Sequence, residues 1–252
     1  MRKREIGSRL FVAALLLSAA VCAAAQNGPA VKQNERARPE TPAAATAPAK
    51  VEDAAGAVTY AYEFKQPEFY ISHVVVEHDA EGRGTVSFER KGLEEPIVEP
   101  LALSAAARAR ITALWEALRF LDSDTDYQAD KQFPHMGTML LRMTRGTRTR
   151  TAEFNWTHDP NAEALTKEYR RAADQAIFIF DINLSRENQP LNSPKLMEQL
   201  DNMLKRDGLS DPQQLIPLLH ELYMDERLPL IARNHAERLL KRIENKAVSA
   251  AQ

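Results

Sequence analysis

The chain has 252 residues, with 33 Lys and Arg against 35 Asp and Glu, and carries a formal net charge of −2 at pH 7. A mildly acidic chain lacks the basic surface that binds nucleic acid, so no nucleic-acid partner is expected. The only cysteine is Cys22, which excludes an internal disulfide framework. Stability therefore has to come from packing.

Residues 1–25 have the three parts of a secretory signal peptide. Basic residues open the segment, an apolar run extends from Leu10 to Val21, and a small-x-small pair, Ala23 and Ala25, precedes Gln26. Cleavage after Ala25 would remove a net charge of +3 and leave about −5 on the mature chain. The segment predicts a secreted or periplasmic protein.

A lipid anchor at Cys22 is the alternative to cleavage at Ala25. Acyl chains attached to this cysteine would hold the protein on a membrane. Val21 argues against that processing, because a small residue is normally required immediately before the cysteine. The apolar run is shorter than the roughly 20 residues of a membrane-spanning helix, so no integral membrane segment is expected once the signal is removed.

Residues 26–57 form an Ala- and Pro-rich stretch with neither helical nor strand periodicity. Such a composition buries too little apolar surface to offset its conformational entropy, so we expect a disordered linker. Residues 58–188 and 193–247 are expected to be an α+β domain and a small C-terminal helical region.

The α+β domain is predicted from two β-hairpins, each followed by a helix. Alternation of apolar and polar residues indicates strands, and Gly-containing segments between them indicate turns. The predicted strands are the run with Tyr60, Tyr62 and Phe64, the run Phe69 to His78, Thr85 to Arg90, Met139 to Met143, and Ala152 to Trp156. We expect an antiparallel sheet of four or five strands, in which Val74 and Val76 face one way and Ile71, His73 and Val75 the other.

Two proline residues, Pro96 and Pro100, are expected to break the chain after the first hairpin. Ser104 is then placed as the N-cap of an amphipathic helix, and its apolar stripe from Ile111 to Leu121 should cover the sheet. A second, longer helix follows Pro160, capped by His158 or Asp159.

Three shorter amphipathic helices are predicted in the C-terminal region, over Pro194 to Arg206, Pro212 to Met224, and Leu228 to about Lys246. Pro217 is expected either to kink the second of these or to delay its start. The last two resemble a single HEAT-type hairpin. One hairpin cannot bury a continuous core by itself, so we expect it to dock on the α+β domain.

The histidines are the first candidates for chemistry. His73 and His78 lie an odd number of positions apart on one strand, so they face opposite sides of the sheet and cannot share a metal. A second possibility is that loop residues converge on a metal, but ligand spacing is lacking. These residues are His135, His158, Asp130 and Asp159. His220 and His235 lie on consecutive helices without an HExxH pattern and are interpreted as surface or packing residues.

Acidic pairs and an arginine cluster complete the candidates. Glu94 with Glu95 and Asp122 with Asp124 lie in polar loops, where solvated turns are the simpler interpretation. Four arginines around one turn would either grip an anionic partner or protect a sheet edge from aggregation. They are Arg142, Arg145, Arg148 and Arg150. With no nucleophile motif and no Gly-rich phosphate loop, no catalytic, cofactor-binding or metal residue and no cofactor is assigned.

Three segments of the sequence are similar to segments of known proteins: Phe69 to His78, Glu153 to Trp156, and Leu228 to Ala236. With these, residues from Val58 to about Asn245 resemble a family of uncharacterised exported bacterial proteins, which implies no activity. The order hairpin, helix, hairpin, helix is more loosely similar to secreted peptidase inhibitors of the emfourin kind and to cystatin-like modules. That likeness is one of architecture, and a fold does not imply a function.

Export, the linker and the lack of a catalytic constellation together predict a non-catalytic module that binds another secreted or envelope protein. A secreted peptidase inhibitor is the first alternative. A hydrolytic or metal-dependent enzyme is the second, disfavoured because metal-ligand spacing is missing.

Overall fold

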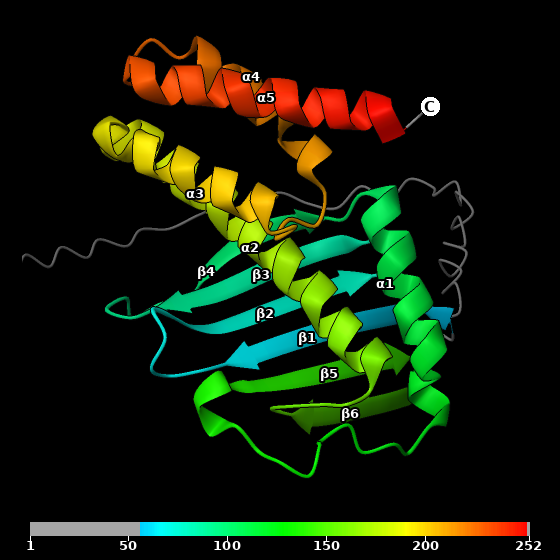
Figure 1. Ribbon diagram of the computed structural model, residues 1–252. Coiled ribbons are helices and arrows are strands. Elements are labelled where there is room, and N and C mark those ends of the chain that lie inside the picture. The colour runs from blue at the N-terminus through cyan, green and yellow to red at the C-terminus, as the bar shows by residue number, and fades with distance from the viewer. Residues whose placement is uncertain (1–55, 251–252) are drawn as a thin grey trace, which may run out of the picture. The chain divides into compact units, whose positions relative to one another are not determined.

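The structure is a computed structural model that describes residues 56–250 (Figure 1). The expected signal peptide 1–25 with its cleavage site, the lipid-anchor alternative at Cys22, and residues 26–55 of the expected linker lie outside the described residues. All described residues belong to one compact unit. The division into parts 58–188 and 193–247 stays a prediction.

An antiparallel sheet of six strands forms the first half of the described chain, which confirms the α+β class. The strand order is β4-β3-β2-β1-β5-β6, so that β1 joins the two predicted hairpins by pairing with both β2 and β5. The strands are β1 (Val58–Lys65), β2 (Ile71–Asp79), β3 (Arg83–Arg90), β4 (Ile97–Ala102), β5 (Thr138–Arg145) and β6 (Arg148–Phe154).

One strand was not expected. Strand β4 contains Pro100, whereas the prediction was that Pro96 and Pro100 break the chain. Because β4 lies at the edge of the sheet and pairs only with β3, one side of its backbone needs no partner. A proline, which has no N–H to donate, is tolerated in such an edge strand.

The alternation of the sequence places the core face as expected for most of β2. Val74 and Val76 are buried, and Tyr62 pairs with Val76 across β1 and β2. The expected position of Ile71 was wrong. A β-bulge between Ile71 and His73 inserts one residue, which turns Ile71 back toward the core.

Helices α1 (Ala105–Leu118) and α2 (Pro160–Asn188) cross one face of the sheet (Figure 1). The Ser104 hydroxyl accepts a hydrogen bond from the Ala107 amide at 3.1 Å and starts α1 as predicted. Of the two expected caps of α2, the structure selects Asp159, whose carboxylate accepts from the amides of Asn161 and Ala162 at 2.9 Å each. Both helices bury their apolar stripes against the sheet.

The second half of α2 begins another apolar core with the C-terminal helices α3 (Ser193–Lys205), α4 (Ile216–Met224) and α5 (Leu230–Ala250). Phe178 and Ile182 of α2 are fully covered there. Pro217 stands in the first turn of α4, after a 3-10 turn, so it delays the helix rather than kinking it. In the described part of the chain, no helix has the length and apolar character needed to cross a membrane.

Four short 3-10 segments connect these elements. They are η2 (Phe120–Asp122), η3 (Pro134–Met136), η4 (Pro190–Asn192) and η5 (Pro212–Leu215).

Hydrogen bonds from polar side chains join the C-terminal region to strand β4 and helix α1. The Gln214 amide donates to the Ala102 carbonyl at 3.0 Å, and Arg110 of α1 donates to the Ser210 carbonyl at 2.7 Å.

Candidate functional site

The histidines singled out from the sequence lie apart. His73 contacts the carboxylates of Glu63 and Glu89 at 2.9 Å each, on the face opposite α2. His78 is buried on the core face. Among residues 56–250, no cluster of three or more His, Cys, Asp or Glu side chains is arranged to hold a metal ion.

The loop histidines are not joined to the acids expected beside them. His135 lies in η3, and its carbonyl accepts a hydrogen bond from Gln66. His158 precedes α2, where the neighbouring Asp159 carboxylate is occupied by its capping role. Asp130 and His220 are exposed, and His235 is half-buried on α5.

The arginines around the β5–β6 turn make intramolecular contacts. Arg148 forms an ion pair with Asp122 at 2.6 Å, and Arg142 forms one with Glu77 at the same distance. Arg150 donates to the Phe120 carbonyl at 2.7 Å, and its guanidinium carbon lies 4.6 Å from the centre of the Phe120 ring. Edge strand β6 is therefore fastened to the segment that follows α1.

The remaining acids expected in loops are solvated. Glu94, Glu95 and Asp124 are exposed. A hydrogen bond from Arg148 lowers the pKa of Asp122 below its usual value. These carboxylates therefore lie at the surface, and Asp122 takes part in fastening β6.

A buried hydrogen-bond chain links β2, α1 and α2. Trp115 Nε1 donates to the Tyr169 hydroxyl oxygen at 2.9 Å. His78 Nδ1 lies 2.7 Å from the Asp79 carbonyl, which only accepts, so Nδ1 carries the proton and neutral Nε2 accepts from the Tyr169 hydroxyl at 2.8 Å. Each polar hydrogen has an acceptor, so the chain of bonds is a structural link between two helices and the sheet.

Burial lowers the pKa of His78 and raises that of Tyr169, because both charged forms lose hydration in the core. The unfolded chain, with a histidine pKa of about 6.5, takes up a proton at a higher pH than the folded protein. We therefore expect the free energy of unfolding to fall as the pH drops below about 6.5, by up to about 1.4 kcal/mol per pH unit.

Urea unfolding between pH 8 and pH 5 measures this effect. Burial also lowers the pKa of His235, so the variant His235→Gln serves as the comparison. The decline should become slightly shallower in His235→Gln and markedly shallower in His78→Gln, which removes the more deeply buried imidazole. An equally steep decline in His78→Gln would contradict the assignment to His78.

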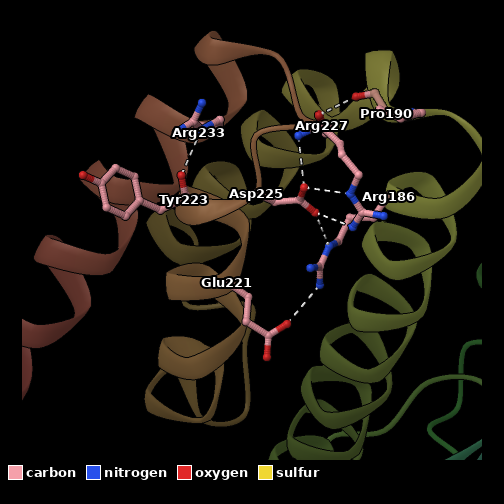
Figure 2. A network of polar contacts seen from close by, with 8 residues as sticks. Arg186, Pro190, Glu221, Tyr223, Asp225, Arg227 and Arg233 are labelled. Atoms are coloured by element: carbon pink, nitrogen blue, oxygen red, sulfur yellow. Dashed lines mark hydrogen bonds and ion pairs between the residues drawn. The ribbon is translucent and has the colours of Figure 1, made fainter.

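A second polar network fastens the α4–α5 connection to α2 (Figure 2). Asp225 accepts from Arg227 Nε at 2.9 Å and Arg227 Nη2 at 2.7 Å, and from Arg186 Nε at 3.3 Å. Arg186 also reaches Glu221 at 3.1 Å. Hydrogen bonds from Arg227 hold the pKa of Asp225 well below its ordinary value. The side chain of Asp225 is only 8% exposed, and the network joins segments 39 residues apart.

Asp225→Asn is expected to lower the free energy of unfolding by about 1–3 kcal/mol, because hydrogen bonds to a largely covered charge are lost. The depressed pKa implies that this contribution is present above about pH 4, the unfolded-state value, and is lost as the pH falls through the folded-state pKa. Urea unfolding at pH 7 measures the cost of the substitution, and a series from pH 5 to pH 2 measures the progressive loss, most of which is expected below about pH 3.5. Glu221→Gln, at the exposed end of the network, should cost less than about 1 kcal/mol; an equal loss in both variants would disagree with this account.

An open apolar hollow of about 510 Å³ lies between the ends of β1 and β2, η3 and α2. Its walls are mainly apolar and come from Phe64, Phe69, Ile71, Val74, Met136 and Ile177. A second hollow of about 380 Å³ continues along α2. Met136, Arg170 and Asp174 line both, and we call the two hollows together the α2 groove.

Exposed apolar side chains mark the rim of the α2 groove. Phe69 is 47% exposed, Met136 42% and Trp156 37%. Phe69 stands beside the Phe64 ring with centroids 6.1 Å apart, and Trp156 packs edge-on against Phe133 at 5.4 Å. These contacts hold the rim residues in place while leaving much of their surface open.

Two local features set the rim. Gln66 Nε2 donates to the carbonyls of Pro134 at 3.1 Å and His135 at 2.8 Å, which ties the β1–β2 connection to η3. Gly137 has φ of +88°, and a Cβ there would lie 2.7 Å from the Lys65 carbonyl oxygen. Only glycine therefore allows the chain to leave η3 so close to β1.

Charged groups occupy the α2 side of the groove. The guanidinium carbon of Arg170 lies 5.3 Å from the centre of the Phe64 ring. Asp174, one helical turn further, is open to the groove yet surrounded by protein on several sides, and this burial raises its pKa although Arg170 and Arg206 oppose the shift. The hydroxyl of Tyr62, a buried lining residue, has no hydrogen-bond partner among the described residues.

The groove was not identified from the sequence. Phe69 was interpreted as a strand residue, although β2 begins at Ile71 and Phe69 lies in the connection before it. One feature of the sequence does point to the groove. Lys167, Arg170 and Asp174 are spaced so that they share one flank of α2 beside its apolar stripe. That flank alone does not reveal the hollow, because η3 lies about 35 residues away in the chain.

No protein-family model matches the chain, and no curated protein is significantly similar to it. The resemblances to exported bacterial proteins and to emfourin-type or cystatin-like inhibitors therefore stay predictions. The geometry of the α2 groove is the basis on which a function can be inferred.

Proposed function

We propose that this protein is a non-catalytic, exported module that binds another protein through the α2 groove. The observation that carries the proposal is the apolar hollow of about 510 Å³ with Phe69 and Met136 exposed on its rim. Export is supported by the signal-like residues 1–25. A secreted or periplasmic partner is the expected target.

Leaving these apolar side chains in contact with water costs free energy. Contiguous exposed apolar surface is uncommon on proteins that act alone and marks interaction sites. A hollow of this size, walled by aromatic and aliphatic groups with a few charges at its edge, matches the usual volume of binding pockets, about 300–1,000 Å³. A partner that fills it removes apolar area from water at roughly 25 cal/mol per Å².

Pull-down from an envelope extract with the chain from Gln26 onward tests the proposal. The bait is compared with the double variant Phe69→Ser and Met136→Ser and with the control Leu191→Ser, whose leucine is 86% exposed in η4. A partner should be recovered by the parent chain and by the control but lost with the double variant. Repeated failure to recover a partner, or equal recovery by all three baits, would refute the proposal.

A secreted peptidase inhibitor is the second candidate. It is favoured by the Gln66 bridge, which holds the β1–β2 connection and η3 together beside exposed Phe69 and Met136. Rigid, preorganised loops lose little conformational entropy on binding and suit insertion into a cleft. Adding the protein to a panel of secreted metallo- and serine peptidases checks this candidate, and full residual activity across the panel would dismiss it.

A further inference from the structure

We propose that the α2 groove receives an internal segment of a partner protein in which a large apolar side chain is followed closely by an acidic one. The apolar side chain occupies the 510 Å³ hollow, and the carboxylate lies beside Arg170 at the boundary of the second hollow. This inference rests on the proposed function and specifies the chemistry of the partner.

The charges of the second hollow carry the argument. Lys167, Arg170 and Arg206 line it, and none of the three has a carboxylate within 4 Å among the described residues. Arg171 and Asp207, which also line it, form an ion pair with each other. Three cations thus face two remaining carboxylates, so the hollow has an excess of positive charge.

Two of the three cations, Arg170 and Arg206, also make contacts that restrict their side chains. Arg170 stacks on the Phe64 ring, so its guanidinium is fixed at the point where the apolar hollow meets the charged one. The side chain of Arg206 donates from Nε to the Asn202 carbonyl at 3.2 Å. A carboxylate arriving between them meets donors whose conformational entropy is already reduced.

The two acids that remain are Glu163 and Asp174. They offset part of the positive charge of the second hollow, so a partner carboxylate is not equally favoured at every point in it. A partner carboxylate near Arg170 would be repelled by Asp174, whose neutral form burial already favours. Arg170 and Asp174, one turn apart on α2, should therefore act in opposite directions on the same ligand.

Binding of synthetic decapeptides to the full chain from Gln26 onward tests the inference. The peptides are acetylated and amidated and differ only in two central residues, Phe-Glu, Phe-Gln, Phe-Lys or Ser-Glu. A fifth peptide ends in Phe with a free carboxylate. Fluorescence anisotropy at about 50 mM salt keeps screening weak. Phe-Glu should bind about threefold to tenfold more tightly than Phe-Gln, Phe-Lys more weakly than both, and Ser-Glu undetectably.

Two variants assign the preference to the groove. Arg170→Gln should remove the advantage of Phe-Glu over Phe-Gln, and Asp174→Asn should increase it. Asp124→Asn, an exposed acid remote in sequence from α2, should change nothing. Unchanged thermal unfolding of each variant shows that the fold is retained.

The outcomes separate this inference from the proposed function. If Phe peptides bind regardless of the neighbouring charge, or if the Phe-Glu advantage survives in Arg170→Gln, the charge inference is overturned and the groove remains a binding site. Tighter binding of the free C-terminal peptide than of Phe-Glu overturns the internal segment in favour of a chain terminus. If no peptide depends on Phe for binding, the α2 groove itself is refuted as the binding surface.

Discussion

Tyr169→Phe is expected to lower the free energy of unfolding by about 2–5 kcal/mol. The variant keeps the ring and removes one oxygen, so that Trp115 Nε1 and His78 Nε2 both lose their partner inside the core. A buried polar group left unpaired costs about 1–3 kcal/mol. Urea unfolding at pH 7.5, where the unfolded-state histidine is neutral, measures the loss as a fall in midpoint at constant slope.

The chain supplies a matched control in Tyr127. This residue is also buried, but its hydroxyl has no hydrogen-bond partner among the described residues. Tyr127→Phe removes the same atom and leaves nothing unpaired, so it should be neutral or stabilising. If both variants lose the same stability, the hydrogen-bond chain has no special role and the cost comes from the hydroxyl group as such.

Gly84→Ala is expected to cost about 3–5 kcal/mol and to lower the melting temperature by about 10 °C. Gly84 lies between its cross-strand partners His78 on β2 and Leu101 on β4. A Cβ built there would lie 1.8 Å from the Glu77 carbonyl oxygen. Because that atom is backbone, β2 and β3 would have to separate, and the displacement would reach the buried His78.

Gly56→Ala is the control, because it adds the same methyl group at a position where no clash is expected. A Cβ at Gly56 meets nothing within 4 Å. Its melting temperature should therefore stay within about 2 °C of the parent protein. Equal melting temperatures for Gly84→Ala and the parent chain would show that β2 and β3 are not held as closely as described.

The order of strands and helices was predictable because its signals are local. The Ser104 cap, the proline at the start of α2 and the alternation along β1 each depend on a few adjacent residues. Strand β4 was missed for a different reason. The cost of Pro100 depends on whether its strand lies inside or at the edge of the sheet, and that position is set by the other strands.

The candidate site was not predictable in the same way. The α2 groove forms where the β1–β2 connection meets η3, and the Gln66 side chain that joins them spans 69 residues. The β-bulge that turns Ile71 toward the groove is equally invisible in the alternation of β2. This meeting of loops places Phe69 and Met136 on one rim beside the hollow. Their exposure alone does not distinguish them, because Leu191 and Met224 are more exposed.

The sequence by itself determined the class of fold and the faces that the helices bury, since hydrophobic periodicity and capping act within a few residues. Tertiary structure alone decided which polar groups became partners. The hydroxyl of Tyr169 meets residues 54 and 91 positions away, and Asp225 meets an arginine 39 positions away. It also decided which apolar groups remained in contact with water. Both depend on the packing of distant segments, because a side chain is buried or paired only by what the rest of the chain places beside it.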